Sequence, residues 1–288
     1  MERTGIDRRR LAALWSHSRR INSWNALRGL PYERCAELPW ILGYLTPRFQ
    51  EQLRYLDVGS GLSLLPTFLL GQTRWDITCA DKFQWVEAQG EYLTRLKVSA
   101  AEAARFHVVK EDFIKSTLAP GTFDVVTSIS VIEHMESQLD SRAMERMGQL
   151  LKPGGVLVLS TLMNEDHFRE FFLEKAVYGV EFKGRPVFYQ RHYDTDSLEK
   201  RVVAPSGLGE VYRVYFGDFA YPCFQRLYCG VPRIVRGLYQ WATPWIASRF
   251  LSYSETPLSR KEMTMNTSSG VILVLEKPAA GAGYGART

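Results

Sequence analysis

The residues best suited to chemistry begin with a glycine turn that directly follows an acidic residue, from Asp57 to Gly61 in the order Asp-Val-Gly-Ser-Gly. Glycine lets the backbone turn tightly and approach a ligand, and a helix expected behind the turn presents free N–H groups and a positive dipole end. Dinucleotide-binding turns carry a third glycine, but Leu64 occupies that position here. A carboxylate at Asp57 would also repel a pyrophosphate in a partly dry site. The turn therefore favours a cationic ligand.

Two further acidic residues follow the next two predicted strands. Asp81 lies 24 residues beyond Asp57, where a carboxylate can accept both hydroxyls of a ribose. Asp112 directly precedes Phe113, and this pair suits the exocyclic amine and the ring of adenine. Each carboxylate alone is more typical of a solvated loop end. Because open α/β sheets bind ligands at the carboxyl ends of their strands, three such residues at successive strand ends predict a nucleoside site.

A parallel sheet is needed to bring these residues together, and the pattern from residue 55 onward predicts one. Short apolar runs rich in β-branched residues alternate with helical patterns. This order predicts an α/β, doubly wound, Rossmann-like fold with helices on both faces of a mostly parallel sheet. The predicted strands are 55–58, 75–80, 106–109, 123–128 and 156–160, and the predicted helices between them are 63–70, 84–96 and 141–151.

The flanking segments complete the expected architecture. Residues 7–27 and 33–45 have helical spacing, Thr46-Pro47 suits a third helix start, and Asp194 or Thr195 is expected to begin a helix through residue 201. Segments 210–216 and 271–275 are expected to pair antiparallel at the edge of a seven-stranded sheet. The predicted organisation is an N-terminal helical cap at 1–53, a ligand-binding core at 54–220, an aromatic and basic insertion at 221–268, a last core strand at 269–278 and a disordered tail at 279–288.

Composition restricts the class of protein and locates its positive charge. The 288 residues carry a net charge of +5, with +5 in residues 1–35, +4 in residues 221–260 and −4 in the remainder. An anionic substrate, a membrane surface, a nucleic acid or simple solvation would each suit the two basic regions. No run of about 18 apolar residues predicts a spanning helix, and no secretory signal is expected. The four cysteines lack metal-site spacing and suit reduced thiols in the cytoplasm.

Together, these motifs resemble those of the class I S-adenosylmethionine-dependent methyltransferase superfamily, in the branch that includes ubiquinone-biosynthesis methyltransferases. The resemblance covers residues 55–161, a little over a third of the chain. The matching segments are the turn at 57–61, Asp81, the Glu-Asp-Phe at 111–113, the Phe-Asp-Val-Val at 123–126, the Val-Ile-Glu-His at 131–134 and the Leu-Lys-Pro-Gly-Gly-Val-Leu at 151–157.

This resemblance implies S-adenosylmethionine as the cofactor and assigns each matching residue to one part of it. The turn would lie against the methionine part, the residues after the second strand against the ribose, and those after the third against adenine. The implied residues are Asp57, Gly59, Gly61, Ile129 and Ser130 for the methionine part, Asp81 for the ribose, and Asp112 and Phe113 for adenine, with Ser60 and Lys82 as further cofactor-binding residues.

The chain also departs from the family's pattern. Ser63 stands where many members have a third glycine, a common variation. Some quinone O-methyltransferases carry a glutamate three residues before the Glu-His pair and use it to bind a metal, but that position here is Ser130, so no metal is predicted. The Asn/Asp-Pro-Pro-aromatic motif of enzymes that methylate base amines is absent after the fourth strand. The absence of this motif disfavours methylation of base amines.

Three histidines are candidates for a catalytic base. Methyl transfer from a sulfonium is an in-line displacement in which the protein supplies position and a dry pocket, and a hydroxyl or protonated amine acceptor also needs a base. His134, near the end of the fourth strand, is the first candidate, with a helix cap or a polar wall as the competing interpretation. His167 and His192 are also expected to face the pocket, whereas His17 and His107 suit structural positions.

The resulting hypothesis is methyl transfer to a small-molecule or lipid-like acceptor, with oxygen favoured over nitrogen or carbon. The alternatives are an NAD-dependent oxidoreductase on a similar fold and a non-catalytic, cofactor-binding partner subunit. The N-terminal helices and the insertion at 221–268 are expected to form the acceptor pocket. The insertion also suits a peripheral membrane contact through residues 221–252 or a satellite core, and nucleic-acid binding is disfavoured.

Overall fold

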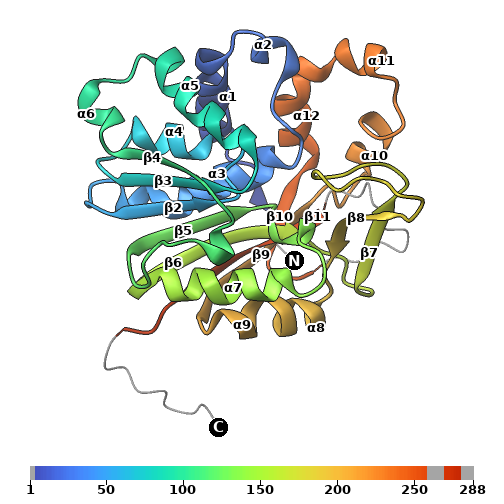
Figure 1. The fold of residues 1–288 in the computed structure, drawn as a ribbon. Helices are drawn as coiled ribbons and strands as arrows, with labels where there is room; N and C mark the ends of the chain where they lie inside the picture. Colours follow the sequence, from blue (N-terminus) through green and yellow to red (C-terminus); the bar gives the residue numbers. More distant parts are fainter. Residues whose placement is uncertain (1–3, 258–268, 280–288) are drawn as a thin grey trace.

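The computed structural model describes residues 4–257 and 269–279, and its central feature is a nine-stranded sheet (Figure 1). The strand order is β1-β10-β9-β11-β6-β5-β2-β3-β4. Strands β2 to β6 run parallel, and the order reverses between β2 and β5. The predicted Rossmann-like α/β fold is thus confirmed. The strands are β1 (Thr4–Gly5), β2 (Arg54–Val58), β3 (Asp76–Asp81), β4 (Phe106–Lys110), β5 (Phe123–Ile129), β6 (Leu151–Leu162), β9 (Gly209–Gly217), β10 (Ser252–Ser254) and β11 (Ser269–Glu276).

Two details of the predicted sheet need correction. Among the described residues the sheet has nine strands instead of seven, because β10 and β1 extend it beyond β9. The predicted antiparallel pair of β9 and β11 forms, but β11 lies inside the sheet, between β9 and β6. All residues of β11 from 270 to 275 are buried. Such a continuous apolar strand is stable only where both of its faces are covered, so it belongs to the interior of the sheet.

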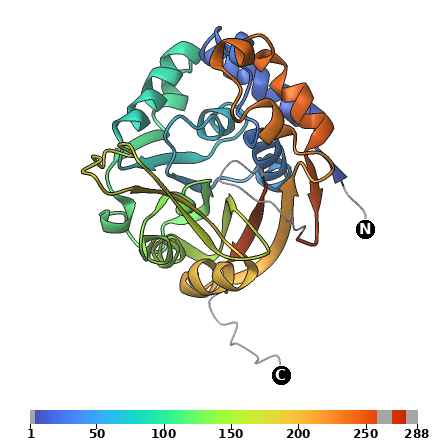
Figure 2. The same cartoon turned by 90° about the vertical axis from the view of Figure 1, so that its right-hand side faces the viewer.

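Helices cover both faces of the sheet and enclose one apolar core on each side. Figures 1 and 2 show the two layers from perpendicular directions. The upper layer contains α1 (Arg8–Ile21), α3 (Arg34–Leu45), α4 (Leu65–Leu70), α5 (Ala88–Leu96) and the short α6 (Ala100–Ala103), and the lower layer contains α7 (Leu139–Leu150), α8 (Thr195–Leu198) and α9 (Ala204–Ser206).

Capping residues explain where several helices begin and end. Asp7 accepts hydrogen bonds from two backbone N–H groups in the first turn of α1, and Asp194 caps α8 in a reciprocal box with Ser197. The predicted helix at 7–27 is two helices, because the chain becomes extended at Asn22 before α2 (Asn25–Arg28). The helix expected at Thr46 is a single 3₁₀ turn, η1 (Thr46–Arg48).

A two-stranded antiparallel hairpin, β7 (Arg169–Leu173) and β8 (Val187–His192), stands apart from the main sheet and was not predicted. A fully buried ion pair fastens it to α7: Arg191 Nη1 lies 2.7 Å from Asp140 Oδ2, and both side chains are fully buried. Arg201 and Tyr193 also donate to Asp140. Loop 174–186 joins the two strands, so the ion pair sets where this loop lies.

The aromatic insertion forms short helices that pack beside α1 and α3. Its helices are α10 (Cys223–Leu227), α11 (Arg233–Gly237), the 3₁₀ turn η6 (Gln240–Ala242) and α12 (Thr243–Phe250). Tyr228 and Phe224 lie against Tyr32, with ring centroids 5.2 and 5.4 Å away. Much of the insertion is therefore continuous with the upper core. Residues 258–268 of the insertion and 280–288 of the expected tail lie outside the described residues.

None of the helices within residues 4–257 and 269–279 has both the length and the apolarity needed to cross a bilayer.

Candidate functional site

A cavity of about 530 Å³ opens at the carboxyl ends of β2 to β5, next to the point where the strand order reverses. This volume is in the range of small-molecule sites. The cavity brings together all ten residues that the sequence assigns to the cofactor. They are Asp57, Gly59, Ser60, Gly61, Asp81, Lys82, Asp112, Phe113, Ile129 and Ser130.

The glycine turn is built so that two of its positions require glycine. Gly59 has φ +70° and Gly61 has φ +41°, in the left-handed region. A Cβ atom on Gly59 would lie only 2.5 Å from Val131 Cγ2. The buried Gln89 amide donates to the carbonyl oxygens of Gly61 and Ser63, at 3.1 and 2.8 Å. Gln89 thus holds the turn in place. Sequence reasoning missed Gln89 because its contacts with the turn span more than 20 residues.

Asp57 is buried beneath the turn and points toward β5. Its Oδ1 accepts a hydrogen bond of 2.5 Å from Thr127 Oγ1, and Thr127 in turn bonds Tyr55 Oη at 2.6 Å. Burial raises the pKa of Asp57 to about 6. A carboxylate in this setting is stabilised by a positively charged neighbour, which suits the cationic ligand predicted from the sequence.

Asp81 ends β3 and anchors the two loops beside it. Its Oδ2 accepts from the backbone N–H of Gly61 at 3.1 Å, and its Oδ1 from that of Phe83 at 2.9 Å. A carboxylate has about four acceptor positions, so two bonds leave capacity for ligand hydroxyls. Burial raises the pKa of this side chain. Lys82 extends over the Phe83 ring, with Nζ 4.9 Å from its centroid.

The third acidic residue, Asp112, caps a short helical turn at the end of β4. Its Oδ1 accepts from the backbone N–H of Ile114 at 3.2 Å, at the start of the 3₁₀ turn η3 (Phe113–Lys115). Phe113 is mostly buried and belongs to the lower core. Both residues line the cavity, with Phe113 contributing to its wall from the core side.

A polar cluster reaches the cavity from α3, far away in sequence, and was not anticipated. Arg34 donates to Ser130 Oγ at 2.8 Å and to the carbonyl oxygen of Ile129 at 3.4 Å, and it pairs with Glu37. Glu37 is fully buried and also accepts from Ser130 at 2.6 Å. Ser130 itself has φ +50°. Arg34 thus places a guanidinium at the end of β5, through contacts that span more than 90 residues and leave no local signal.

His134 lines the cavity and is held through Nδ1. This nitrogen lies 2.9 Å from the carbonyl oxygen of Tyr189 and 2.9 Å from Tyr178 Oη. A carbonyl oxygen only accepts, so Nδ1 carries the proton in the neutral ring and Nε2 carries the lone pair. Burial lowers the pKa of His134. The ring is therefore neutral and suited to accept a proton at Nε2.

The prediction that His167 and His192 face the pocket is wrong, since neither lines the cavity. His192 is fully buried under the hairpin, where its Nε2 lies 3.0 Å from Gln190 Nε2 and its ring lies beside Phe171. Burial lowers its pKa to about 4. His167 is exposed and hydrogen-bonds Arg169. His167 lies before β7 and His192 ends β8, whereas the hairpin residues that line the cavity are Val177, Tyr178, Val180, Val187 and Phe188.

The outer wall of the cavity comes from the β7–β8 loop and the segment between α2 and α3. Tyr178 stacks parallel to Tyr189, with ring centroids 6.2 Å apart, and lies 6.1 Å from Phe83. Leu30 and Pro31 add an apolar wall. No described residue of the insertion lines this cavity, contrary to the expected pocket. The insertion packs on α1 and α3 instead. The β7–β8 hairpin forms the part of the wall that the sequence assigned to the insertion.

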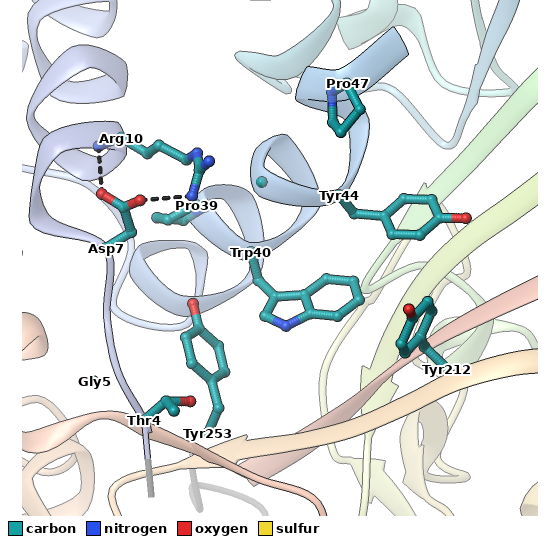
Figure 3. Close-up of a pocket in the computed structure, with 11 residues that line it drawn as sticks. Thr4, Gly5, Asp7, Arg10, Pro39, Trp40, Tyr44, Pro47, Tyr212 and Tyr253 are labelled. Carbon is teal, nitrogen blue, oxygen red and sulfur yellow. Dashed lines mark hydrogen bonds and ion pairs between the residues drawn. The ribbon is translucent and has the colours of Figure 1, made fainter.

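A second cavity of about 580 Å³ lies at the opposite edge of the sheet, between α1, α3 and β9 (Figure 3). Its aromatic residues include Trp40 and Tyr44, whose rings are parallel with centroids 6.0 Å apart. Asp7 accepts hydrogen bonds from the backbone and the guanidinium of Arg10 at its rim. None of the residues that the sequence assigned to the cofactor or to catalysis lines this cavity.

Within the described ranges, no group of three or more histidine, cysteine, aspartate or glutamate side chains has an arrangement that could hold a metal ion.

The profile of a methyltransferase-domain family matches residues 31–201. This match begins just before α3 and ends beyond the β7–β8 hairpin, so it spans every residue of the first cavity except Leu30. Among curated proteins, no sequence matches the chain.

Solved structures share the fold at low sequence identity. An S-adenosylmethionine-dependent methyltransferase from Methanosarcina mazei is 14% identical, with a TM-score of 0.51, and the match covers 82% of this chain and 97% of that chain. A 1,6-didemethyltoxoflavin-N1-methyltransferase from Burkholderia thailandensis, solved with bound 1,6-didemethyltoxoflavin and S-adenosylhomocysteine, is 15% identical, with a TM-score of 0.51 over 93% and 88% of the chains. The cyclase SpnF is 16% identical, with a TM-score of 0.50 over 83% and 81%. The likeness is one of fold.

Proposed function

This chain belongs to the methyltransferase-domain family, whose cofactor is S-adenosylmethionine, and we propose that it transfers a methyl group to the oxygen of a small, hydrophobic or lipid-like acceptor. The observation that carries this proposal is that one cavity holds the acidic glycine turn, two further strand-end carboxylates and a neutral histidine. Membership of this family also supports methyl transfer over the nicotinamide-dependent alternative.

The groups around the cavity fit this cofactor. The backbone N–H of Gly61 lies 3.1 Å from Asp81 Oδ2 and both residues line the cavity, so the turn and the carboxylate border the same space. The cofactor carries a sulfonium and an ammonium group, and Asp57 and Asp81 place negative charge around it. Arg34 supplies the complementary donor for a carboxylate. The donor set therefore matches a zwitterionic amino acid joined to a nucleoside.

Each residue then has a distinct task in binding. When bound, the cofactor supplies an electrophilic methyl group. Asp57 accepts from the ammonium end and Asp81 from the ribose hydroxyls. Arg34 donates to the methionine carboxylate while Glu37 and Ser130 keep the guanidinium in place. Holding both reactants in one orientation is the main source of rate in a displacement of this kind.

His134 is proposed as the base that removes the acceptor's proton. Its Nδ1–H is engaged by the carbonyl oxygen of Tyr189, which leaves Nε2 to accept. Because burial lowers its pKa, the ring stays neutral at pH 7 and does not repel the cationic cofactor. Both a hydroxyl and a protonated amine need such a base, and the absence of the base-amine motif after β5 favours oxygen between them.

The acceptor class is proposed from the outer wall. Leu30, Pro31 and Val187 are apolar, and Tyr178 and Phe188 add aromatic surface. Pockets of this kind bind hydrophobic ligands and use a few polar groups for orientation. A flat or elongated apolar acceptor with one hydroxyl group fits this arrangement.

Calorimetry with S-adenosylhomocysteine tests the cofactor site. Asp81→Ala should weaken binding by about 1–3 kcal/mol, because hydrogen bonds to a charged group are lost. Asp166→Ala, which removes an exposed aspartate outside the cavity, serves as the matched control and should bind like the wild type. Absence of binding by the wild type at millimolar concentration would remove the proposal.

Turnover distinguishes the enzyme from a non-catalytic partner subunit. Release of S-adenosylhomocysteine from S-adenosylmethionine is measured against a panel of hydroxylated aromatic and amphiphilic compounds. His134→Gln should lower the rate by about 10²–10⁴-fold while cofactor affinity is retained. Tight cofactor binding without release for any compound would favour the non-catalytic alternative.

A further inference from the structure

Large apolar side chains that no core covers gather at one end of the molecule. Ile234, on α11, is 87% exposed, and Leu238, directly after this helix, is 76% exposed. Monomeric proteins often expose single apolar residues, but a contiguous group marks a contact surface. We call this group the α2–α12 face, and it comprises Trp24 just before α2, Leu27 of α2, Ile234 and Val235 of α11, Leu238, Trp241 of η6 and Trp245 of α12.

Several contacts join the elements that carry these side chains. The rings of Trp241 and Trp245 lie 5.5 Å apart, and Trp15 of α1 lies 5.3 Å from Trp245. Helix α2 packs against η6, and Gly29, just after α2, approaches the backbone of Gln240 so closely that a side chain would not fit there. Figures 1 and 2 both place α2 and α11 at the same end of the molecule. The face thus joins segments more than 200 residues apart in sequence.

The charged residues within the segments that carry this face are all positive. The two chain segments that build it, residues 19–32 and 219–254, contain seven arginines and no aspartate or glutamate. Arg20, Arg28, Arg233 and Arg249 are exposed. Tryptophan, leucine and isoleucine beside arginine are the residues by which short helices lie in the boundary between lipid headgroups and acyl chains. Arginine guanidinium groups also pair well with phosphate.

We propose that the α2–α12 face docks on an anionic lipid bilayer. Ile234 and Leu238 enter the headgroup–acyl boundary, the tryptophans lie at headgroup depth, and the arginines contact lipid phosphates. The short helices lie on the bilayer and do not cross it. The idea that the bilayer supplies the acceptor rests on the proposed function, in which a lipid-like acceptor would be presented at the membrane.

The face adjoins the cavity through the segment that follows α2. Trp24 and Leu27 belong to the face, whereas Leu30 and Pro31, a few residues later, line the cofactor cavity. The same short stretch of chain therefore contacts the bilayer on one side and the cavity on the other. This placement brings the apolar outer wall of the cavity near the lipid surface.

Flotation of the full chain with vesicles tests the proposal. Phosphatidylcholine vesicles are compared with vesicles that also contain phosphatidylglycerol, and the protein should float with the anionic vesicles. Ile234→Asp combined with Leu238→Asp should reduce binding by at least about ten-fold, because two side chains no longer enter the apolar layer. Val211→Asp, at an exposed apolar position on β9, is the matched control and should bind like the wild type.

A second pair of variants tests the electrostatic part. Arg233→Glu and Arg249→Glu should each weaken binding to anionic vesicles by about five-fold or more, and added salt should weaken the wild type in the same way. Arg142→Glu, an exposed arginine on α7 in the lower layer, should have little effect. Circular dichroism confirms that each variant is folded.

The outcomes separate this proposal from the proposed function. If the wild type binds S-adenosylhomocysteine but neither type of vesicle, the bilayer proposal is overturned and the cofactor site stands. If the wild type floats with anionic vesicles but does not bind S-adenosylhomocysteine, the reverse holds. Sedimentation that shows a dimer which Leu238→Asp dissociates, without vesicle binding, would assign the face to a second copy of the chain and would also overturn the bilayer proposal.

Discussion

At the scale of single residues, the protonation of His134 decides whether it can serve as a base. We expect the ring to be neutral at pH 7, with the proton on Nδ1, because Nδ1 lies 2.9 Å from the carbonyl oxygen of Tyr189 and burial lowers the pKa. Nitrogen-15 NMR of the histidine ring distinguishes the two tautomers and follows the titration. A proton on Nε2, or a pKa above 6.5, would contradict this assignment.

The neighbouring Glu133 predicts a pH dependence of stability. Burial raises its pKa from 4.5 to about 8, and its Oε2 accepts a bond of 3.2 Å from Thr161. The folded state holds this proton more tightly than the unfolded chain does. The stability that Glu133 contributes is therefore complete below pH 4.5 and is lost as the pH rises through about 8.

Glu133→Gln should remove this dependence, because the amide does not ionise. From pH 5 to pH 8 the free energy of unfolding of the wild type should fall relative to that of the variant, by at most about 1.4 kcal/mol per pH unit. Urea unfolding at several pH values measures it. Glu145→Gln, at an exposed position of α7, is the control. A pH-independent difference would show that Glu133 ionises normally.

Sequence reasoning located the acidic and glycine residues of the cavity but not the residues that hold them. Asp57, Asp81 and Asp112 were predictable because each lies within two residues of the end of a strand, and parallel strands end at one edge of the sheet. Arg34 and Gln89 were not, because their partners lie far away in the sequence. Roles in cofactor binding and catalysis stay predictions for all of these residues.

At the scale of elements, the close contact between the glycine turn and the loop after β5 predicts the cost of a methyl group. Gly59→Ala should destabilise the protein in two ways, since φ is +70° and the added Cβ would lie 2.5 Å from Val131. The left-handed backbone alone costs roughly 1–2 kcal/mol, and overpacking adds roughly 1–3 kcal/mol.

Gly121 provides the matched comparison for this substitution. It has φ +62° but no atom within 4 Å of its Cβ position, so Gly121→Ala should show only the backbone cost. Urea unfolding of both variants separates the steric part, and Gly59→Ala combined with Val131→Ala should recover some of it. Equal losses for the two single variants would show that the turn moves away from Val131 freely.

Elements with a strong hydrophobic pattern in the sequence were predicted, and elements with a weak pattern were not. Strands β2 to β6 carry apolar runs and were predicted. The β7–β8 hairpin mixes exposed and buried residues, with Arg191 and His192 buried by tertiary contacts, so its pattern does not alternate. β10 and β1 are only three and two residues long. The predicted boundary between helical cap and core stays a prediction, and α1, α3 and α4 share one apolar core.

At the scale of the whole molecule, charge and apolar surface are distributed unevenly. The net charge of +5 was readable from the sequence, as was its concentration in two regions. That α2 and the distant insertion lie side by side was not readable, because the packing of Gly29 against Gln240 joins segments from opposite ends of the chain. The sequence thus indicated that the insertion is basic and aromatic, and the fold showed that α2 lies beside it.

The short stretch after α2 links two binding events. Trp24 and Leu27 lie on the α2–α12 face, and Leu30 and Pro31 line the cavity. By thermodynamic linkage, whatever factor the bilayer imposes on cofactor affinity, the cofactor must impose on bilayer affinity. Vesicle partition measured with and without saturating S-adenosylhomocysteine reads this factor from one side, and calorimetry with and without vesicles from the other. If the two factors are equal and differ from one, the membrane is an allosteric effector of this methyltransferase.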